Sequence, residues 1–234
     1  AERKAYLEGD WDAFNESMDA GGWIRLINDD QLANCFVPPI EHGGYKVLGV
    51  DPAAGGDNSA IVLKSANAQE ILFNQKLNDV MDLVSVVYER YRKHQVSAVV
   101  VDKSGIGQGV FDRLKQMNCT VHGISFGEKA SNEAFFNLKA ELHWKQRQWL
   151  LSGGRLIQDY GWNEFAIVKY KNADGRVKIQ SKEELFRHGL SSPNCVDAAV
   201  LTQYVSDRSI KATRLIKNNQ GQFHDKMIEI WRGR

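Results

Sequence analysis

Three aspartates stand where buried elements are expected to end or begin. Asp51 follows the apolar run at 46–50, Asp102 follows a similar run at 97–101, and Asp197 shares the apolar face of an expected helix. Buried like charges must be neutralised, and divalent cations neutralise them. Two strand-end acids and one helix acid therefore predict a two-metal phosphoryl-transfer site, whose ions, about 3.5–4 Å apart, activate water and stabilise the leaving oxygen.

Other residues with chemical potential have competing interpretations. The glycine-rich loop at 104–109 could cradle a phosphate on its backbone amides, or it could be a tight turn from strand to helix. Asp57 is expected in a turn, and Asp102 could simply cap the loop that follows it. His143 and His188 have no companion at metal-ligand spacing, which favours surface or hydrogen-bonding roles.

Composition indicates a protein with a substantial core. The chain has 234 residues, 43% of them hydrophobic, and six tryptophans, while the net charge of +1 favours no class of partner. Three cysteines without metal-ligand spacing argue against a disulfide framework and a zinc site, and they fit a reducing cytoplasm. Without a long apolar run or a signal peptide, we expect a soluble protein and no membrane partner. A first residue other than Met suggests a fragment of a longer protein.

The first half of the chain predicts a sheet that begins as an antiparallel meander. Three expected strands follow one another through short turns, at 46–51, 59–65 and 70–74. A helix capped by Asp79 then crosses over to a fourth strand at 97–102, parallel to the first. If these two strands are neighbours, Asp51 and Asp102 lie side by side at their carboxyl ends.

The second half adds helices, a hairpin and further strands. The expected elements, in order, are a helix at 108–117, a strand at 120–125, a long helix from Ser131 or Asn132 to Leu151, a strand at 155–157, a hairpin of 164–170 and 176–180, a short helix opened by the capping box Ser181 to Glu184, and a helix capped by Ser192, with Pro193 in its first turn, that runs to about Ser206. We expect residues 1–44 to be an irregular or helical linker, here called the lead-in, and 207–234 to be a basic tail, solvated or in contact with a partner.

This order of elements is that of the ribonuclease H-like fold, and several motifs extend the likeness. They are GVDPA at 49–53, GDNS at 56–59, VDKSGIG at 101–107, GVFD at 109–112, SKEEL at 181–185 and SPNCVDA at 192–198. Together they resemble the nuclease domain of the large terminase subunit of tailed bacteriophages. GDWDAF at 9–14 is similar to the segment that follows the packaging ATPase in those proteins.

The resemblance implies a fold, a site and an activity. The fold is α/β and ribonuclease H-like, with a mixed central sheet flanked by helices and an added β-hairpin, spanning residues 45–206 after a lead-in from an absent ATPase domain. Asp51, Asp102 and Asp197 would bind two Mg²⁺ or Mn²⁺ ions and catalyse the cutting of concatemeric DNA without strong sequence specificity. The family often has an acid or a histidine three residues before the last aspartate, where this chain has Asn194.

The resemblance also implies partners and a location. Double-stranded DNA would be the substrate, and the motor ATPase domain of the same polypeptide, the portal protein and the small terminase subunit would be partners. The protein would act in the host bacterial cytoplasm as a part of the packaging motor and be absent from the mature virion. No Gly-x-x-x-x-Gly-Lys-Ser/Thr loop is present, so ATP hydrolysis is not expected from this chain.

Lysines provide the expected contacts with DNA. Five of them surround the hairpin and the approach to Asp197, namely Lys129, Lys169, Lys171, Lys178 and Lys182. If they border the site, they would follow the phosphate backbone without reading bases. Lys139, on the long helix, could equally belong to a solvated face or contact a phosphate.

Two other functions fit parts of the pattern. Sugar kinases and actin-like ATPases also place an aspartate and a glycine-rich turn after a first strand, but they need a duplicated domain, for which this chain is too short. A non-catalytic DNA-binding or docking module of ribonuclease H-like fold would use the same acids only structurally.

Overall fold

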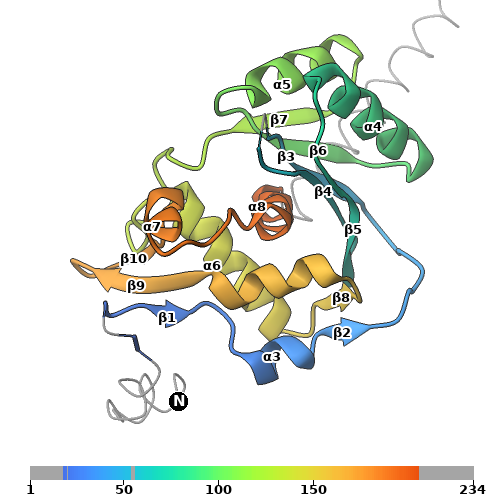
Figure 1. The fold of residues 1–234 in the computed structure, drawn as a ribbon. Helices are drawn as coiled ribbons and strands as arrows, with labels where there is room; N and C mark the ends of the chain where they lie inside the picture. The colour runs from blue at the N-terminus through green and yellow to red at the C-terminus, as the bar shows by residue number, and fades with distance from the viewer. Residues whose placement is uncertain (1–17, 20, 54–55, 206–234) are drawn as a thin grey trace, which may run out of the picture.

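The computed structural model describes residues 18–19, 21–53 and 56–205 (Figure 1). Within these residues the chain forms a seven-stranded sheet in the order β2-β8-β5-β4-β3-β6-β7 and a three-stranded sheet in the order β1-β9-β10. The expected tail at 207–234 and the GDWDAF segment lie outside the described residues. No helix of the described part is long and apolar enough to cross a membrane.

The large sheet is the predicted mixed sheet. Its strands are β2 (Phe36–Val37), β3 (Val47–Asp51), β4 (Ser59–Lys64), β5 (Ala68–Gln75), β6 (Ala98–Asp102), β7 (Val121–Ile124) and β8 (Arg155–Ile157). Strands β3, β4 and β5 pair antiparallel, β6 pairs parallel with β3, and β7 pairs parallel with β6. Strand β8 adds parallel to β5, and β2 adds parallel to β8. The predicted meander and crossover are therefore confirmed.

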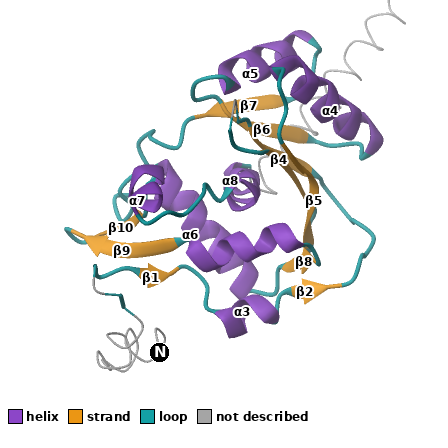
Figure 2. Ribbon diagram, in the orientation of Figure 1, coloured by secondary structure: helices purple, strands orange, loops and turns teal. Residues whose placement is uncertain are grey.

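Helices cover both faces of this sheet (Figure 2). On one face lie α4 (Val80–Lys93) and α5 (Gly107–Gln116), and on the other lie α6 (Leu138–Leu151), α8 (Asn194–Leu201) and the 3₁₀ turn η2 (Thr202–Tyr204). Leu48 and Val50 pack in the core on the α4 side, whereas Val47 packs in the core on the α8 side. Because side chains alternate along a strand, Asp51 at the end of β3 points towards α8.

The described part of the lead-in is not a linker, which corrects the prediction for residues 18–44. Strand β1 (Ile24–Arg25) pairs with β9, and β2 joins the edge of the large sheet. Between them, α3 (Asp29–Ala33) begins with a reciprocal capping box of Asn28 and Gln31. Leu26 and Ile27 are fully buried, so these short apolar runs contribute to the core instead of connecting domains.

Two helix starts differ from the prediction. Helix α6 begins at Leu138 after the cap Asn137, because Ser131 instead donates two hydrogen bonds, from N and Oγ at 2.6 Å, to the carboxylate of Glu141. Helix α8 begins at Asn194, and its cap residue is Pro193, whose side chain makes no capping hydrogen bond. Ser192 is therefore not the cap.

The hairpin is shorter than predicted. Its strands are β9 (Lys169–Ala173) and β10 (Arg176–Ile179), and residues 160–167 form the 3₁₀ segment η1 (Tyr160–Ile167) before it. Asp159 begins η1 by accepting the N–H of Gly161 at 2.8 Å. The predicted capping box is confirmed, because Ser181 and Glu184 bond reciprocally at the start of α7 (Lys182–Arg187).

Gly49 allows α8 to lie directly on β3. A Cβ at this position would lie 1.9 Å from the carbonyl oxygen of Ala198 and 2.9 Å from Cγ2 of Thr202.

Gly49→Ala should therefore lower the free energy of unfolding by more than about 3 kcal/mol, because the helix must move off the strand. Thermal unfolding measures this. The control is Gly43→Ala, which meets no atom within 4 Å and should unfold like the wild type; equal stability of the two variants would contradict the prediction.

Candidate metal-binding active site

The three aspartates converge from two neighbouring strands and one helix. Asp51 is the last residue of β3, and Asp102 is the last residue of β6, whose Val101 pairs with Val50. Like Asp51, Asp102 points to the α8 face, because Ala98 and Val100 of the same alternation pack there. Asp197, in the first turn of α8, is fully buried. The two strand-end acids therefore lie side by side, facing the helix acid.

The loop after Asp102 is a strand-to-helix turn. Asp102 Oδ1 accepts the backbone N–H of Ser104 at 3.0 Å, so this aspartate also caps the loop. A Cβ at Gly107 would lie 1.8 Å from the carbonyl oxygen of Asp102, which shows how closely the start of α5 folds back on the strand. The structure therefore favours the tight turn over the phosphate cradle.

Opposite pKa shifts divide the two buried acids. Burial raises the pKa of Asp51 well above its usual value, and the nearby charges of Asp197 and Asp102 raise it further. Burial alone would also raise the pKa of Asp197, but the charge of Lys139, the adjacent ring of His143 and the charge of Lys182 lower it to about 2. Without metal, Asp51 therefore keeps its proton to a higher pH than Asp197 does.

Helix α6 supplies two partners for Asp197. Lys139 Nζ lies 3.7 Å and His143 Nε2 lies 3.5 Å from Asp197 Oδ1, and the side chain of His143 is fully buried. Burial lowers the pKa of His143, so the imidazole is neutral at neutral pH and Lys139 is the cation that keeps Asp197 ionised. Of the two roles expected for His143, the hydrogen-bonding role is confirmed, because Nδ1 bonds the carbonyl oxygen of Lys139, and the surface role is wrong, because the side chain is buried beside the acids.

The tautomer of His143 follows from its other nitrogen. Nδ1 lies 2.8 Å from the carbonyl oxygen of Lys139, which can only accept, so Nδ1 carries the hydrogen and Nε2 keeps a lone pair. That lone pair faces a carboxylate oxygen. Sequence reasoning missed this residue because its partners come from a helix 54 positions away; the only local signal was its place one turn after Lys139.

Lys182 is a second predicted lysine whose charge interacts with the acids. Burial opposes its charge, but Asp51, Asp197 and Asp102 together raise its pKa. Because Lys182 begins α7, the Ser181 capping box also fixes the start of the helix that carries it. The cation is therefore held in the field of all three aspartates.

Whether a cation fits this site can be judged from the buried acceptor atoms that have no hydrogen-bond donor. The buried side-chain atoms around Asp197 that lack a hydrogen-bond partner include Asp51 Oδ2, both carboxylate oxygens of Asp197, His143 Nε2 and Asn194 Oδ1. All of them are potential metal ligands, so a divalent cation fits their chemistry. Among the described residues, however, no three His, Cys, Asp or Glu side chains are grouped closely enough to hold one ion. Further oxygens must therefore complete any coordination shell.

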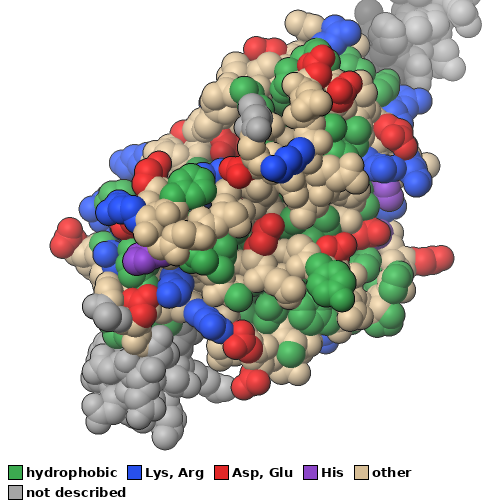
Figure 3. All heavy atoms as spheres, viewed as in Figure 1, with side chains coloured by type: hydrophobic (Ala, Val, Ile, Leu, Met, Phe, Trp, Pro, Cys, Tyr) green, Lys and Arg blue, Asp and Glu red, His purple; other side chains and the backbone are tan. Residues whose placement is uncertain are grey.

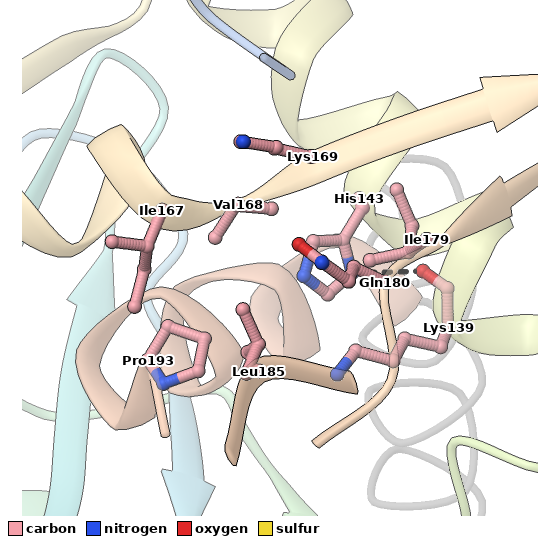
Figure 4. Close-up of a pocket in the computed structure, with 9 residues that line it drawn as sticks. All are labelled: Lys139, His143, Ile167, Val168, Lys169, Ile179, Gln180, Leu185 and Pro193. Atoms are coloured by element: carbon pink, nitrogen blue, oxygen red, sulfur yellow. Dashed lines mark hydrogen bonds between the residues drawn. The ribbon is translucent and has the colours of Figure 1, made fainter. Parts of the chain in front are cut away.

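A small pocket lies beside the acids, between α6, α7, the hairpin and the start of α8 (Figure 4). Lys139, His143 and Pro193 are among the residues that line it, and it has room for about one water molecule. Asp51 and Asp102 do not line it. The pocket thus lies on the α6 side of Asp197, away from the ends of the strands.

The remaining predicted lysines surround the hairpin. Lys169 Nζ lies 2.8 Å from Asp19 Oδ2, Lys171 Nζ lies 4.3 Å from the ring centre of Trp23, and Lys178 Nζ lies 3.8 Å from Glu184 Oε1. Lys129 is exposed. Lys and Arg side chains are visible over the end of the molecule that contains α7, β9 and β10 (Figure 3). Of these six lysines, Lys139 and Lys182 are the ones that interact with Asp51, Asp102 or Asp197.

The chain is similar in fold to solved structures of phage terminase nuclease domains. The chain is similar to the nuclease domain of the large terminase subunit gp2 of bacterial virus Sf6, with 15% identity, a TM-score of 0.68, and coverage of 78% of this chain and 100% of that domain. A structure of a variant of the Sf6 domain with manganese gives 14% identity and a TM-score of 0.67, with the same coverage. The large terminase nuclease of thermophilic phage G20c with bound magnesium gives 16% identity and a TM-score of 0.55, covering 74% of this chain and 93% of that one.

No protein-family profile matches the sequence, and neither does any curated protein. The likeness at this level of identity concerns the fold. The chain therefore has the ribonuclease H-like fold of terminase nuclease domains, as its motifs indicated.

Proposed function

We propose that this chain is the metal-dependent DNA endonuclease domain of a viral packaging terminase, and that it cuts concatemeric DNA by a two-metal mechanism. The observation that carries this proposal is the group of unpartnered acceptors at the end of β3 and the start of α8, beside Asp102 at the end of β6. The structural likeness to phage terminase nucleases, some of them solved with manganese or magnesium, supports it.

The three aspartates would hold the ions. Asp51, Asp102 and Asp197 are the metal ligands and catalytic acids of this proposal, with Mg²⁺ or Mn²⁺ as the two ions. Such ions supply a nucleophilic water at neutral pH and stabilise charge on the leaving oxygen. Lys139 keeps Asp197 ionised and ready to coordinate. Lys182 lies in the field of the acids, where its positive charge would attract a phosphodiester.

Double-stranded DNA would approach along the lysines. In this proposal Lys129, Lys139, Lys169, Lys171, Lys178 and Lys182 contact phosphates, which position DNA but carry no sequence information. The wider context is also proposed: a nuclease domain made of residues 45–206 together with strands β1 and β2 of the lead-in, which join its two sheets; the motor ATPase of the same polypeptide before it; the portal protein and small terminase subunit as partners; and the host bacterial cytoplasm as the place of action.

Plasmid nicking tests the activity. Supercoiled plasmid of unrelated sequence should be nicked and linearised in Mn²⁺ or Mg²⁺, and an excess of chelator should prevent this. The alternative, a non-catalytic DNA-binding or docking module, predicts that the protein shifts DNA in a gel without cutting it in either ion. That outcome with metal-loaded protein would overturn the proposal.

The lysines of the hairpin give a prediction about DNA affinity. Lys169→Ala combined with Lys171→Ala should weaken binding of every DNA sequence similarly and lower the slope of log affinity against log salt by about one unit for each lost phosphate contact. Because these lysines already contact Asp19 and Trp23, the slope should change by less than the two units expected for two full phosphate contacts. Salt titration of DNA affinity measures this, with Lys93→Ala on α4 as the control. An unchanged slope would assign these lysines to a solvated surface.

Asn194 gives a prediction about the metal. Its buried Oδ1 has no partner, and its position three residues before Asp197 places it on the same side of α8. An added carboxylate should tighten metal binding, so Asn194→Asp should raise Mg²⁺ affinity by about tenfold and reduce the advantage of Mn²⁺ in cleavage. Calorimetric titration without DNA measures it. Two tight Mg²⁺ sites in the wild type would contradict this, since three carboxylates should leave at least one ion weakly bound.

A further inference from the structure

Helix α8 begins without a capping side chain of its own. Its cap residue, Pro193, has no side-chain acceptor, and the next three residues, 194–196, precede the first intrahelical bond, from Asp197 N to Pro193 O at 2.8 Å. The N–H groups of this first turn therefore need acceptors from elsewhere. This requirement matters because the same turn carries Asp197.

A carboxylate from another element meets the requirement. Glu164 Oε2 accepts the backbone N–H of Cys195 at 2.7 Å and that of Val196 at 3.2 Å. A negative charge at a helix N-terminus also interacts favourably with the helix dipole. Glu164 thus replaces the missing cap from 31 residues away in the sequence.

The element that carries Glu164 has a buried, hydrogen-bonded core and packs on α8. Trp162 and Phe165 of η1 are fully buried and stacked, and Trp162 Nε1 donates to the carbonyl oxygen of Ile157 in β8 at 2.8 Å. A Cβ on Gly161 would lie 2.8 Å from Sγ of Cys195, so η1 and α8 are in close contact. The segment that carries the carboxylate is therefore anchored to β8 of the large sheet and to α8.

We propose that Glu164 is a positioning residue for Asp197: by binding the two N–H groups that precede it, Glu164 fixes the first turn of α8 and with it the direction of the Asp197 carboxylate. This inference rests on the proposed function, in which Asp197 is a metal ligand. Glu164 does not touch Asp197 and is not assigned to the metal. Its role is indirect, like that of groups that orient metal ligands, whose loss typically costs about 10–100-fold in metal affinity or activity.

Three variants and a neighbour test the inference. Glu164→Ala removes the acceptor of both N–H groups, Glu164→Gln keeps an oxygen acceptor but no charge, and Glu164→Asp keeps the charge on a shorter side chain. The exposed neighbour Asn163 provides the matched control, Asn163→Ala, which changes η1 without touching α8. Burial raises the pKa of Glu164 to about 7, so the measurements are made at pH 8, where the carboxylate is ionised.

The first readout is Mn²⁺ affinity by calorimetry, and the second is plasmid cleavage separated into kcat and KM. Glu164→Ala should weaken Mn²⁺ binding and lower kcat by about 10–100-fold while KM for DNA stays within twofold. Glu164→Gln should recover part of both losses, and Asn163→Ala should match the wild type. Hydrogen exchange should become faster at the amides of Cys195 and Val196 in Glu164→Ala only.

The outcomes separate the two proposals. A wild type that cuts DNA, together with Glu164→Ala and Glu164→Gln variants of normal Mn²⁺ affinity and kcat, would overturn the positioning role alone. Lower thermal stability with unchanged metal affinity would do the same, because it would reduce Glu164 to a structural cap. A wild type that neither binds Mn²⁺ nor cuts would overturn the proposed function, and the role of Glu164 towards a metal ligand with it.

Discussion

Asp51→Asn should reduce plasmid cleavage by at least about 10³-fold and yet raise the stability of the metal-free protein. The loss of about 4 kcal/mol of transition-state stabilisation follows from removing a ligand charge at the proposed metal site. The gain follows from burial, because the wild-type carboxyl sits without a partner on Oδ2 and close to two like charges. An amide of nearly the same shape removes that repulsion.

The stability gained by Asp51→Asn should depend on pH, in a direction set by the raised pKa of Asp51. The pKa of Asp51 is raised in the folded state, so between the ordinary carboxyl value and the raised one the folded protein binds more protons than the unfolded protein. The neutral form therefore favours folding at low pH, and this contribution is lost as pH rises through the raised pKa. The stability advantage of Asp51→Asn over the wild type should accordingly grow from pH 5 to pH 8.

Thermal unfolding in chelator across this pH range, alongside plasmid cleavage in Mn²⁺, tests both halves. Asp112→Asn is the control, because Asp112 is exposed on α5 and an amide oxygen can still accept from Gln108. It should change neither measurement. An Asp51→Asn protein that cuts at near wild-type rates would remove Asp51 from the site, and one that unfolds at lower temperature at pH 8 would show that the carboxylate has a stabilising partner.

The central sheet could be predicted from the sequence because its signals are local. The runs that end in Asp51 and Asp102 are β-branched and bounded by turn residues, and the helix between them keeps a clear apolar period. Parallel pairing of the two strands then places both acids at one edge. The direction of their side chains follows from the same alternation that buries Val47 and Val100.

The surroundings of Asp197 could not be predicted because they are tertiary. Ser192 and Pro193 have the composition of a helix start, yet the acceptor for this helix is Glu164, from a 3₁₀ segment that resembled a strand. His143 approaches Asp197 from α6, with no spacing in the sequence to connect them. Strands β1 and β2, each of two residues, are too short to show any period.

Asp197→Asn should also abolish cleavage, but unlike Asp51→Asn it should destabilise the protein. If repulsion were the only interaction among the three aspartates, each substitution to asparagine would keep or raise the stability of the metal-free protein. The environment of Asp197 differs from that of Asp51, because Lys139 Nζ lies 3.7 Å from Asp197 Oδ1 and only 12% of that lysine side chain is exposed. Removing one member of a buried ion pair leaves the other charge uncompensated.

The expected loss of stability in Asp197→Asn follows from the lowered pKa of Asp197. The pKa of Asp197 falls from 3.8 to about 2, which corresponds to about 2 kcal/mol of folding free energy. A lowered pKa gives stability that is fully present above the ordinary carboxyl value and is lost as pH falls towards 2. Between pH 5 and pH 8 this contribution is constant, so the destabilisation by Asp197→Asn should be nearly independent of pH, in contrast to the growing advantage of Asp51→Asn.

A double-mutant cycle of Asp51→Asn and Asp197→Asn, measured in chelator, tests whether the two acids affect stability in these opposite ways. Repulsion between the two acids is removed by either single substitution and can be removed only once, so the double variant should be less stable than the sum of the two effects predicts, by about 1 kcal/mol. Chemical denaturation at pH 8 measures all four proteins. Additive effects would mean that the two carboxylates do not interact, and a stabilised Asp197→Asn protein would mean that Lys139 does not compensate its charge. In the second case Lys139 of α6 would not keep Asp197 ionised. The proposal that Asp197 is ionised and able to bind a cation before metal arrives would then be wrong as well.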